Sequence, residues 1–194
     1  MEVTSDYVIA YMKGLDLRAE SKSDSSLLTT FNYGLTNLAT QILCFTEQEQ
    51  IDLSSYAGLS EITFTMASNV IDFYDCYVID TATEEKQLTG FKVKYTNDKR
   101  VTLVVDNPDL LADFSLVVKY FYYPVLTTTN TITVEPEIWH YLKHSVQIVY
   151  WGGVKDYEKE QYHTKVLDDH LSQKIIGMPK DMAEDSMRGF VWLG

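Results

Sequence analysis

The sequence has 194 residues, of which 45% are apolar and 13% aromatic, which is enough for a buried core and too rich in apolar anchors for a disordered chain. Its 28 acidic and 16 basic residues give a formal net charge of −12, and lysine and arginine form no cluster, which disfavours tight binding to a phosphate backbone. The first 14 residues include Glu2 and Asp6 and only a short apolar run, so they predict neither a secretion signal nor a membrane span.

Two helices are predicted before the middle of the chain. The first covers Ser5–Lys13, with its first residue as N-cap and Gly14 as C-cap. The second begins near Asp24 or Ser25 and has one apolar face. Its apolar residues recur at helical spacing: Leu27, Leu28, Phe31, Leu35, Leu38 and Ile42.

From residue 49 to residue 123 the apolar period changes to two, which is typical of strands. The runs 62–66 and 91–95 alternate between apolar and polar residues, whereas 71–80 and 114–123 are partly apolar on both faces, as expected of central strands. Turn-forming residues separate these runs, and a short strand is predicted at 132–134. The fold class predicted is α+β, an antiparallel β-sheet or sandwich of five to seven strands flanked by N-terminal helices and a C-terminal helical hairpin.

The C-terminal hairpin is predicted from a proline and two glycines. Pro136 occupies the first position of a helix that runs to about Trp151, Gly152 and Gly153 end it, and a second helix covers Lys155 to about Ile175. The chain is predicted to form a single domain with four parts: helices in 1–46, a β-sandwich-like core in 47–134, the hairpin in 135–176 and an extended tail in 177–194.

Two apolar segments near the C-terminus indicate interfaces. The second half of the first hairpin helix is apolar on all sides, so either the fold or a neighbouring subunit must cover it. The chain ends in an aromatic tip that is costly to leave in water. The predicted interface residues are Trp139, Tyr150, Trp151, Phe190, Trp192 and Leu193.

The four histidines are interpreted as helix-surface or interface residues. His140 and His144 have the four-residue spacing that lets two imidazoles share a metal, but Tyr141 stands where a zinc hydrolase of the HExxH type carries its glutamate. His163 and His170 are seven residues apart on the last helix. We therefore predict no metal site.

No enzymatic activity and no cofactor are predicted. The sequence has no GxSxG, no GxxxxGK[ST] and no GxGxxG motif, and Cys44 and Cys76 are interpreted as reduced core residues. The aspartates are attributed to turns and strand ends, because their spacing does not fit a calcium loop: Asp72, Asp75, Asp106 and Asp109.

The order of these elements carries a family resemblance. A helix ending near Ile42 leads to a strand at 50–53, a meander containing Leu88-Thr89-Gly90-Phe91 and a closing strand at 116–120 before Tyr123-Pro124. The segment 133–140, which starts a helix at its proline, and the charged helix after Trp151 follow. From residue 27 to 172 this order resembles the head-to-tail connector (adaptor) proteins of tailed bacteriophages.

The resemblance implies a structural virion protein of the neck or tail, assembled in the host cytoplasm. It implies a homo-oligomeric ring, twelve-fold by that resemblance, that binds the portal protein and tail nozzle or tail tube proteins. DNA would pass through the ring without specific binding, and no membrane is involved. Three alternatives stay open: another tail, collar or baseplate component, a carbohydrate-binding β-sandwich module in which the aromatic run 120–123 lines a sugar-binding face, or an unrecognised hydrolase that would lose activity on mutation of Asp72 or His140.

Overall fold

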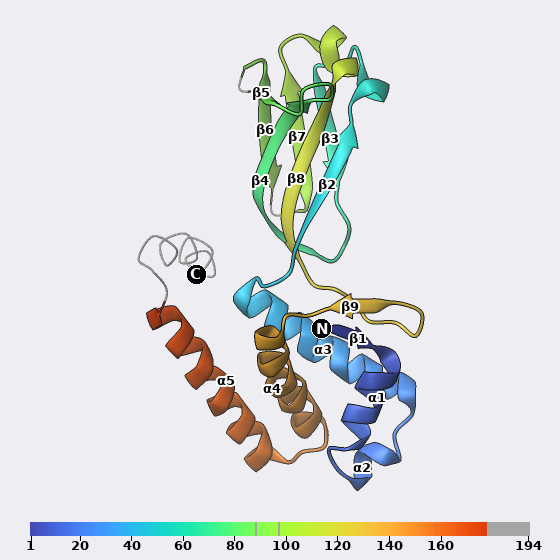
Figure 1. The fold of residues 1–194 in the computed structure, drawn as a ribbon, viewed down its shortest axis with the longest axis vertical. Helices are drawn as coiled ribbons and strands as arrows, with labels where there is room; N and C mark the ends of the chain where they lie inside the picture. Colours follow the sequence, from blue (N-terminus) through green and yellow to red (C-terminus); the bar gives the residue numbers. More distant parts are fainter. Residues whose placement is uncertain (88, 97, 178–194) are drawn as a thin grey trace. The chain divides into compact units, whose positions relative to one another are not determined.

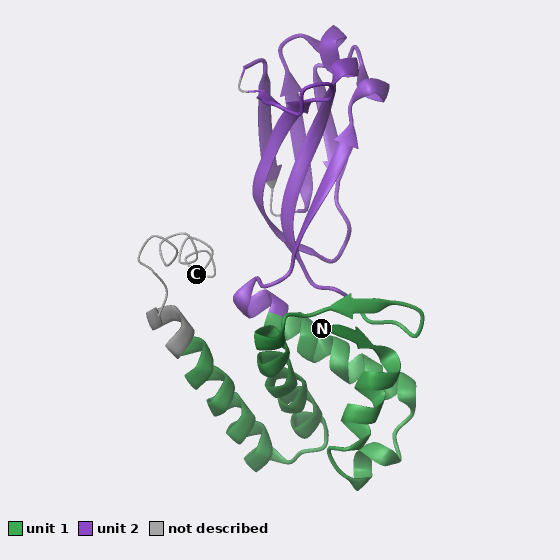
Figure 2. Ribbon diagram, viewed as in Figure 1, with its two compact units in different colours: residues 1–38, 125–194 green, residues 39–124 purple. Residues whose placement is uncertain are grey.

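The computed structural model of the chain describes residues 1–177 apart from residues 88 and 97. The chain forms two compact units (Figure 2). Unit 1 combines residues 1–38 with the chain from residue 125 onward, and unit 2 comprises residues 39–124. The single domain expected from the sequence is thus built as a helical unit made from both ends of the chain and a β unit made from its middle.

Unit 2 consists of two antiparallel sheets (Figure 1). One sheet has the order β2-β8-β4-β5, with β2 at Thr46–Asp52, β4 at Val70–Asp80, β5 at Lys86–Gln87 and β8 at Phe114–Tyr122. The other has the order β3-β7-β6, with β3 at Glu61–Thr65, β6 at Phe91–Thr96 and β7 at Arg100–Val105. Short 3-10 turns lie at Ser54–Tyr56 and Pro108–Asp113. This arrangement confirms the predicted α+β class.

The core of unit 2 follows from the alternation of side chains along its strands. Val101, Leu103 and Val105 of β7 are buried at every second position. In β8, by contrast, Leu116 to Val118 are buried consecutively, as expected of a strand with a hydrogen-bonded neighbour on each side. The buried cluster draws all of its members from unit 2: Leu53, Ile62, Met66, Val70, Phe73, Val78, Val101, Leu103, Val105, Leu111, Leu116, Val118 and Tyr120.

Unit 1 contains the helices and a small two-stranded sheet. The helices are α1 at Ser5–Lys13, α2 at Leu17–Glu20, α3 at Asp24–Ile42, α4 at Pro136–Gly153 and α5 at Tyr157–Gly177, with residues 39–42 of α3 assigned to unit 2. Strand β1 at Glu2–Thr4 pairs antiparallel with β9 at Thr131–Thr133. In the described part of the chain, no helix combines the length and the apolar composition needed to cross a membrane.

The ends of the helices agree with the sequence analysis to within about two residues, and α5 begins at Tyr157 rather than at Lys155. The N-cap of α1 is Thr4 and not Ser5: the Thr4 side chain accepts a hydrogen bond from the Tyr7 amide (3.2 Å), while Ser5 is buried. Gly14 ends the helix as predicted. α4 begins at Pro136 as predicted but continues through Gly153, so the two glycines form its last turn.

The core of unit 1 is aromatic where α1, α3 and α4 meet. The ring of Trp139 lies 5.5 Å from that of Tyr7, 5.9 Å from that of Tyr11 and 6.4 Å from that of Phe31, measured between centroids. Such tilted and edge-on pairs stabilise a core beyond their buried area. Trp139 therefore fixes how three helices pack together.

Helices α3 and α4 approach each other closely at Gly34. The Ser145 hydroxyl of α4 donates a hydrogen bond to the Gly34 carbonyl (2.7 Å), and a β-carbon placed on Gly34 would lie 2.6 Å from Cα of Val146. A glycine is therefore required at this crossing. Nearby, the Asn32 amide group both donates to and accepts from the backbone of Leu126, with both distances at 2.9 Å, which holds the chain entering from unit 2 against α3.

A half-buried carboxylate joins α2 to α4. Asp16 caps α2 by accepting from the Ala19 amide (2.9 Å), and it also accepts from Arg18 Nε (2.7 Å) and the Tyr150 hydroxyl (2.5 Å). Burial alone would raise the pKa of Asp16, but these hydrogen bonds outweigh it and lower the pKa to about 2. The folded protein therefore favours the ionised form.

We expect Asp16→Asn to lower the free energy of unfolding at pH 7 by about 2 kcal/mol, because the ionised group is stabilised in the folded state. An aspartate whose folded pKa is depressed stabilises fully above its unfolded pKa of 3.8, and this contribution is lost as the pH falls towards 2. Urea unfolding should therefore show the gap between wild type and variant closing below pH 3.8. A gap independent of pH would contradict this. Asp98→Asn, in an exposed pair with Arg100, is the control and should change stability by about 0.5 kcal/mol or less.

Candidate functional site

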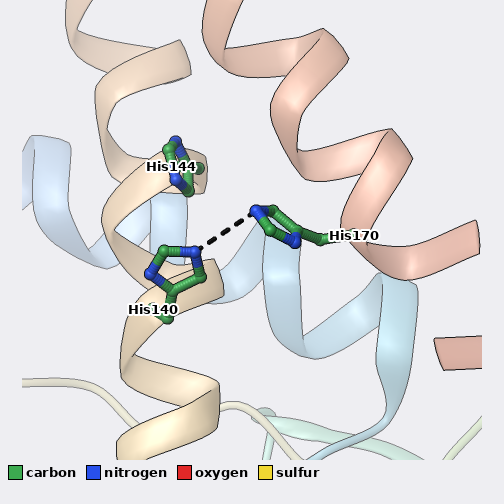
Figure 3. Close-up of side chains that lie close together, drawn as sticks. All are labelled: His140, His144 and His170. Carbon is green, nitrogen blue, oxygen red and sulfur yellow. Dashed lines mark hydrogen bonds between the residues drawn. The ribbon is translucent and has the colours of Figure 1, made fainter. Parts of the chain in front are cut away.

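All four histidines of the chain come together between α4 and α5. His140 and His144 lie on α4, and His163 and His170 lie on α5. Nε2 of His140 is 3.3 Å from Nε2 of His170, and Nδ1 of His144 is 3.0 Å from Nδ1 of His163. Figure 3 shows the rings of His140 and His170 pointing toward each other, with His144 next to them on α4.

Helical spacing and the tight connection between α4 and α5 produce this cluster. A separation of four residues is about one helical turn and one of seven is about two, so each pair lies on one face of its helix. The chain reverses at 154–156, where Lys155 adopts a positive φ of 60° and the Asp156 amide donates to the Trp151 carbonyl (2.9 Å). His140 and His170 are equally far along the chain from Lys155, so they meet at the same level of the hairpin.

The surroundings of His144 and His163 favour their neutral imidazoles. Burial, followed by the proximity of His163, His140 and His170, lowers the pKa of His144 to about 4. Burial, followed by the nearby ammonium group of Lys159, lowers the pKa of His163. A neutral imidazole has one donor and one acceptor nitrogen, so the close contact between His144 and His163 holds a single shared proton.

The arrangement can hold a metal ion. The candidate ligand atoms of His140, His144 and His170 all lie within 4.8 Å of one another, and the three side chains range from half-buried to exposed, so an ion can reach them from solvent. Neutral imidazole is a common ligand of zinc and other late transition metals. The histidines are half-buried or exposed on their helices, as the sequence analysis expected, but that analysis did not predict that they come together.

The histidines can act as metal ligands, but the glutamate that serves as the hydrolytic base in an HExxH site is replaced by a tyrosine. Tyr141 follows His140, as the sequence showed, and its side chain is buried at 7% exposure. Its hydroxyl donates a hydrogen bond to Oε1 of Glu137 (3.1 Å). The carboxylate of Glu137, which lies about one turn before His140 on the same helix, therefore already accepts a hydrogen bond from Tyr141. This geometry favours a structural or binding role for the cluster over hydrolysis.

The predicted interface residues of α4 are buried inside unit 1, which corrects their assignment. Trp139, Tyr150 and Trp151 are 8%, 1% and 3% exposed. The α2 segment and α5 help to cover the end of α4: Lys159 Nζ lies 4.0 Å from the centre of the Trp151 ring and Arg18 Cζ 5.6 Å from it. The fold of the chain itself therefore covers these three aromatic side chains, whereas Ile148 and Val149 of the same helix are half-buried. The other predicted interface residues lie outside the described part of the chain: Phe190, Trp192 and Leu193.

The remaining candidates have local structural roles. Asp72 accepts a hydrogen bond from the Phe73 amide (2.8 Å), and Asp75 lies 3.4 Å from the Lys86 ammonium group. Cys44 and Cys76 are not joined by a disulfide, and both are half-buried. Burial raises the pKa of Cys76 to about 11, which keeps its thiol protonated and unreactive at neutral pH.

The sequence contains a signal for the histidine cluster that inspection of each helix by itself missed. Two histidine pairs on adjacent helices, placed symmetrically about a short connection, meet when the helices form an antiparallel hairpin.

Comparison with protein-family models gives no match for the chain, and comparison with curated proteins gives none either.

Proposed function

We propose that the chain is a structural assembly subunit of the head-to-tail connector type, which joins the portal of a tailed bacteriophage to its tail. The order of elements carries the proposal. Helix α3, the strands β2 to β8, the proline-initiated helix α4 and the charged helix α5 follow one another between residues 27 and 172, the stretch over which the sequence resembles that family. On this proposal the protein is located in the virion and has no enzymatic role.

The distribution of charge supports the proposal. A ring around a DNA channel must let the duplex pass without binding it tightly. A predominantly acidic surface offers few grouped lysine and arginine side chains to bind the DNA phosphates. The net charge is −12, and most basic side chains with a described ion pair lie beside an aspartate, as Lys13 lies beside Asp24 (2.7 Å). Weak interaction with DNA is therefore the expected behaviour.

The burial of Trp151 changes how the proposal should be tested. Replacing a tryptophan that is 3% exposed would destabilise unit 1, so failed assembly would say nothing about docking. The aromatic tip of the chain offers a better variant, Phe190→Ala combined with Trp192→Ala and Leu193→Ala. Leu17, which is 80% exposed in unit 1, provides the control variant Leu17→Ala.

The test is to mix the purified chain with the portal protein of the phage that encodes it and to image the product by electron microscopy. We expect a ring of this chain bound to the portal vertex, loss of the ring with the triple variant, and a normal ring with Leu17→Ala. Binding to the tail tip or baseplate, with none to the portal, would contradict the connector proposal. A normal ring from the triple variant would leave the connector role intact and contradict the docking role of the tip.

Carbohydrate binding is the second candidate, and an exposed tyrosine beside a half-buried phenylalanine on the four-stranded sheet favours it. Tyr74 is 46% exposed, and its ring centroid lies 4.9 Å from that of Phe121 on the neighbouring strand. Aromatic rings of this kind can stack on the apolar faces of sugars. Glycan-array binding that disappears with Tyr74→Ala would support this alternative, and an array without any bound glycan would count against it.

A further inference from the structure

We propose that His140, His144 and His170 bind one divalent transition-metal ion, with zinc as the best match, and that the bound ion fastens α5 to α4. The inference is independent of the connector proposal, because it rests on the side chains between two helices of unit 1. Three observations carry it: the spacing of the ligand atoms, the chemistry of the groups around them, and the sparse burial of α5.

The distance between the ligand nitrogens of His140 and His170 fits a tetrahedral metal site closely, and the position of His144 fits it approximately. Zinc binds imidazole nitrogen at about 2.0–2.1 Å, so two nitrogens in a tetrahedral site lie about 3.4 Å apart. Nε2 of His140 and Nε2 of His170 are 3.3 Å apart and come from different helices. All three candidate nitrogens lie within 4.8 Å of one another, so a movement of about 1.5 Å, within reach of side-chain rotation, completes the set.

The chemistry of the cluster suits a cation. His140 faces His170, and His144 faces His163, so each ring has another imidazole as its described hydrogen-bond partner. Two neutral imidazoles placed nitrogen to nitrogen share one proton and leave no second donor. A metal ion instead accepts a lone pair from each ring, so imidazoles of both helices can bind the same ion.

The choice of metal follows from the ligands. Calcium and magnesium prefer oxygen ligands, whereas imidazole suits zinc, copper, nickel and cobalt. Three histidines on helices, with a fourth position for water, is an arrangement that zinc accepts. We assign His163 a positioning role, because its Nδ1 contacts the Nδ1 of His144 and a partner of this kind orients a ligand ring.

The expected effect is on the attachment of α5. Among residues 157–172 of this helix, Leu167 is the single buried residue, and the rest are half-buried or exposed. An apolar contact as small as this holds a helix weakly. An ion that binds ligands from both helices only when they are docked stabilises the docked state by mass action.

The test uses the full chain without an affinity tag, freed of metal by a chelator and titrated with Zn²⁺ in a calorimeter. We expect one ion per chain and a rise of about 5–10 °C in the melting temperature of unit 1 when free zinc exceeds the dissociation constant 100-fold. Cobalt should give the intense visible absorption of a tetrahedral site. Mg²⁺ and Ca²⁺ should produce neither effect.

Variants then separate a built site from incidental binding to histidine. His140→Gln, His144→Gln and His170→Gln should each weaken zinc binding at least 100-fold while helical circular dichroism of the metal-free protein is unchanged, whereas His163→Ala should keep one ion per chain and lose about tenfold in affinity or less. The inference is overturned if wild type binds no zinc, if His170→Gln binds as tightly as wild type, or if His163→Ala abolishes binding as completely as His170→Gln.

Discussion

Gly34→Val should destabilise unit 1 by about 3 kcal/mol or more. The first added carbon would lie 2.6 Å from Cα, 2.7 Å from Cγ2 and 2.8 Å from the backbone nitrogen of Val146. Two of these atoms belong to the backbone of α4, so a rotation of one side chain cannot relieve the overlap. The helices would have to separate, which would also break the bond from Ser145 to the Gly34 carbonyl and leave a buried hydroxyl without its acceptor.

Gly153→Ala is the matched control for this prediction. Gly153 lies in the last turn of α4, and a β-carbon added there meets no atom within 4 Å. Because alanine favours helix by up to about 1 kcal/mol over glycine, this variant should be neutral or slightly stabilised. Urea unfolding followed by far-ultraviolet circular dichroism compares the two variants. Equal stability of Gly34→Val and wild type would show that α3 and α4 do not need the close approach.

Local signals predicted most of the secondary structure correctly. Helix α1 was predicted with the bounds Ser5–Lys13 because polar residues and a glycine flank a short apolar run. The start of α4 at Pro136 was predicted because proline lacks only an amide that the first helical turn leaves unpaired. Alternating apolar and polar residues predicted two strands of unit 2, at 62–66 and 91–95, which correspond to β3 and β6.

Long-range features escaped the sequence analysis, since no short window contains both partners. Strand β1 has three residues and exists because Val3 pairs with Ile132, far along the chain. The need for a glycine at Gly34 comes from the position of Val146 on another helix. The apolar end of α4 was assigned to an interface because the sequence could not show that residues near Arg18 and Lys159 cover Trp151. The histidine cluster likewise depends on the register of two helices.

Residues 43–124, expressed alone, should fold as a stable β-sandwich. The buried cluster of unit 2 contains no residue from outside this range, and every strand of its two sheets pairs with another strand of the same unit. A chain of this size with one complete core is expected to unfold cooperatively with a free energy of about 3–5 kcal/mol. By contrast, unit 1 needs both ends of the chain, so neither of its segments should fold by itself.

Urea unfolding of the fragment, followed by circular dichroism, checks this expectation. Leu103→Asp is the control variant, because Leu103 is fully buried and an isolated carboxylate there should abolish folding. A fragment without a cooperative transition would show that unit 2 depends on unit 1. The fragment also bears on the metal inference: it contains none of the four histidines, so it should bind no zinc while keeping its fold. Zinc binding by the fragment would place the ion away from α4 and α5. A folded fragment that binds no zinc is the expected result, because folding of the sandwich and metal binding then belong to separate parts of one chain.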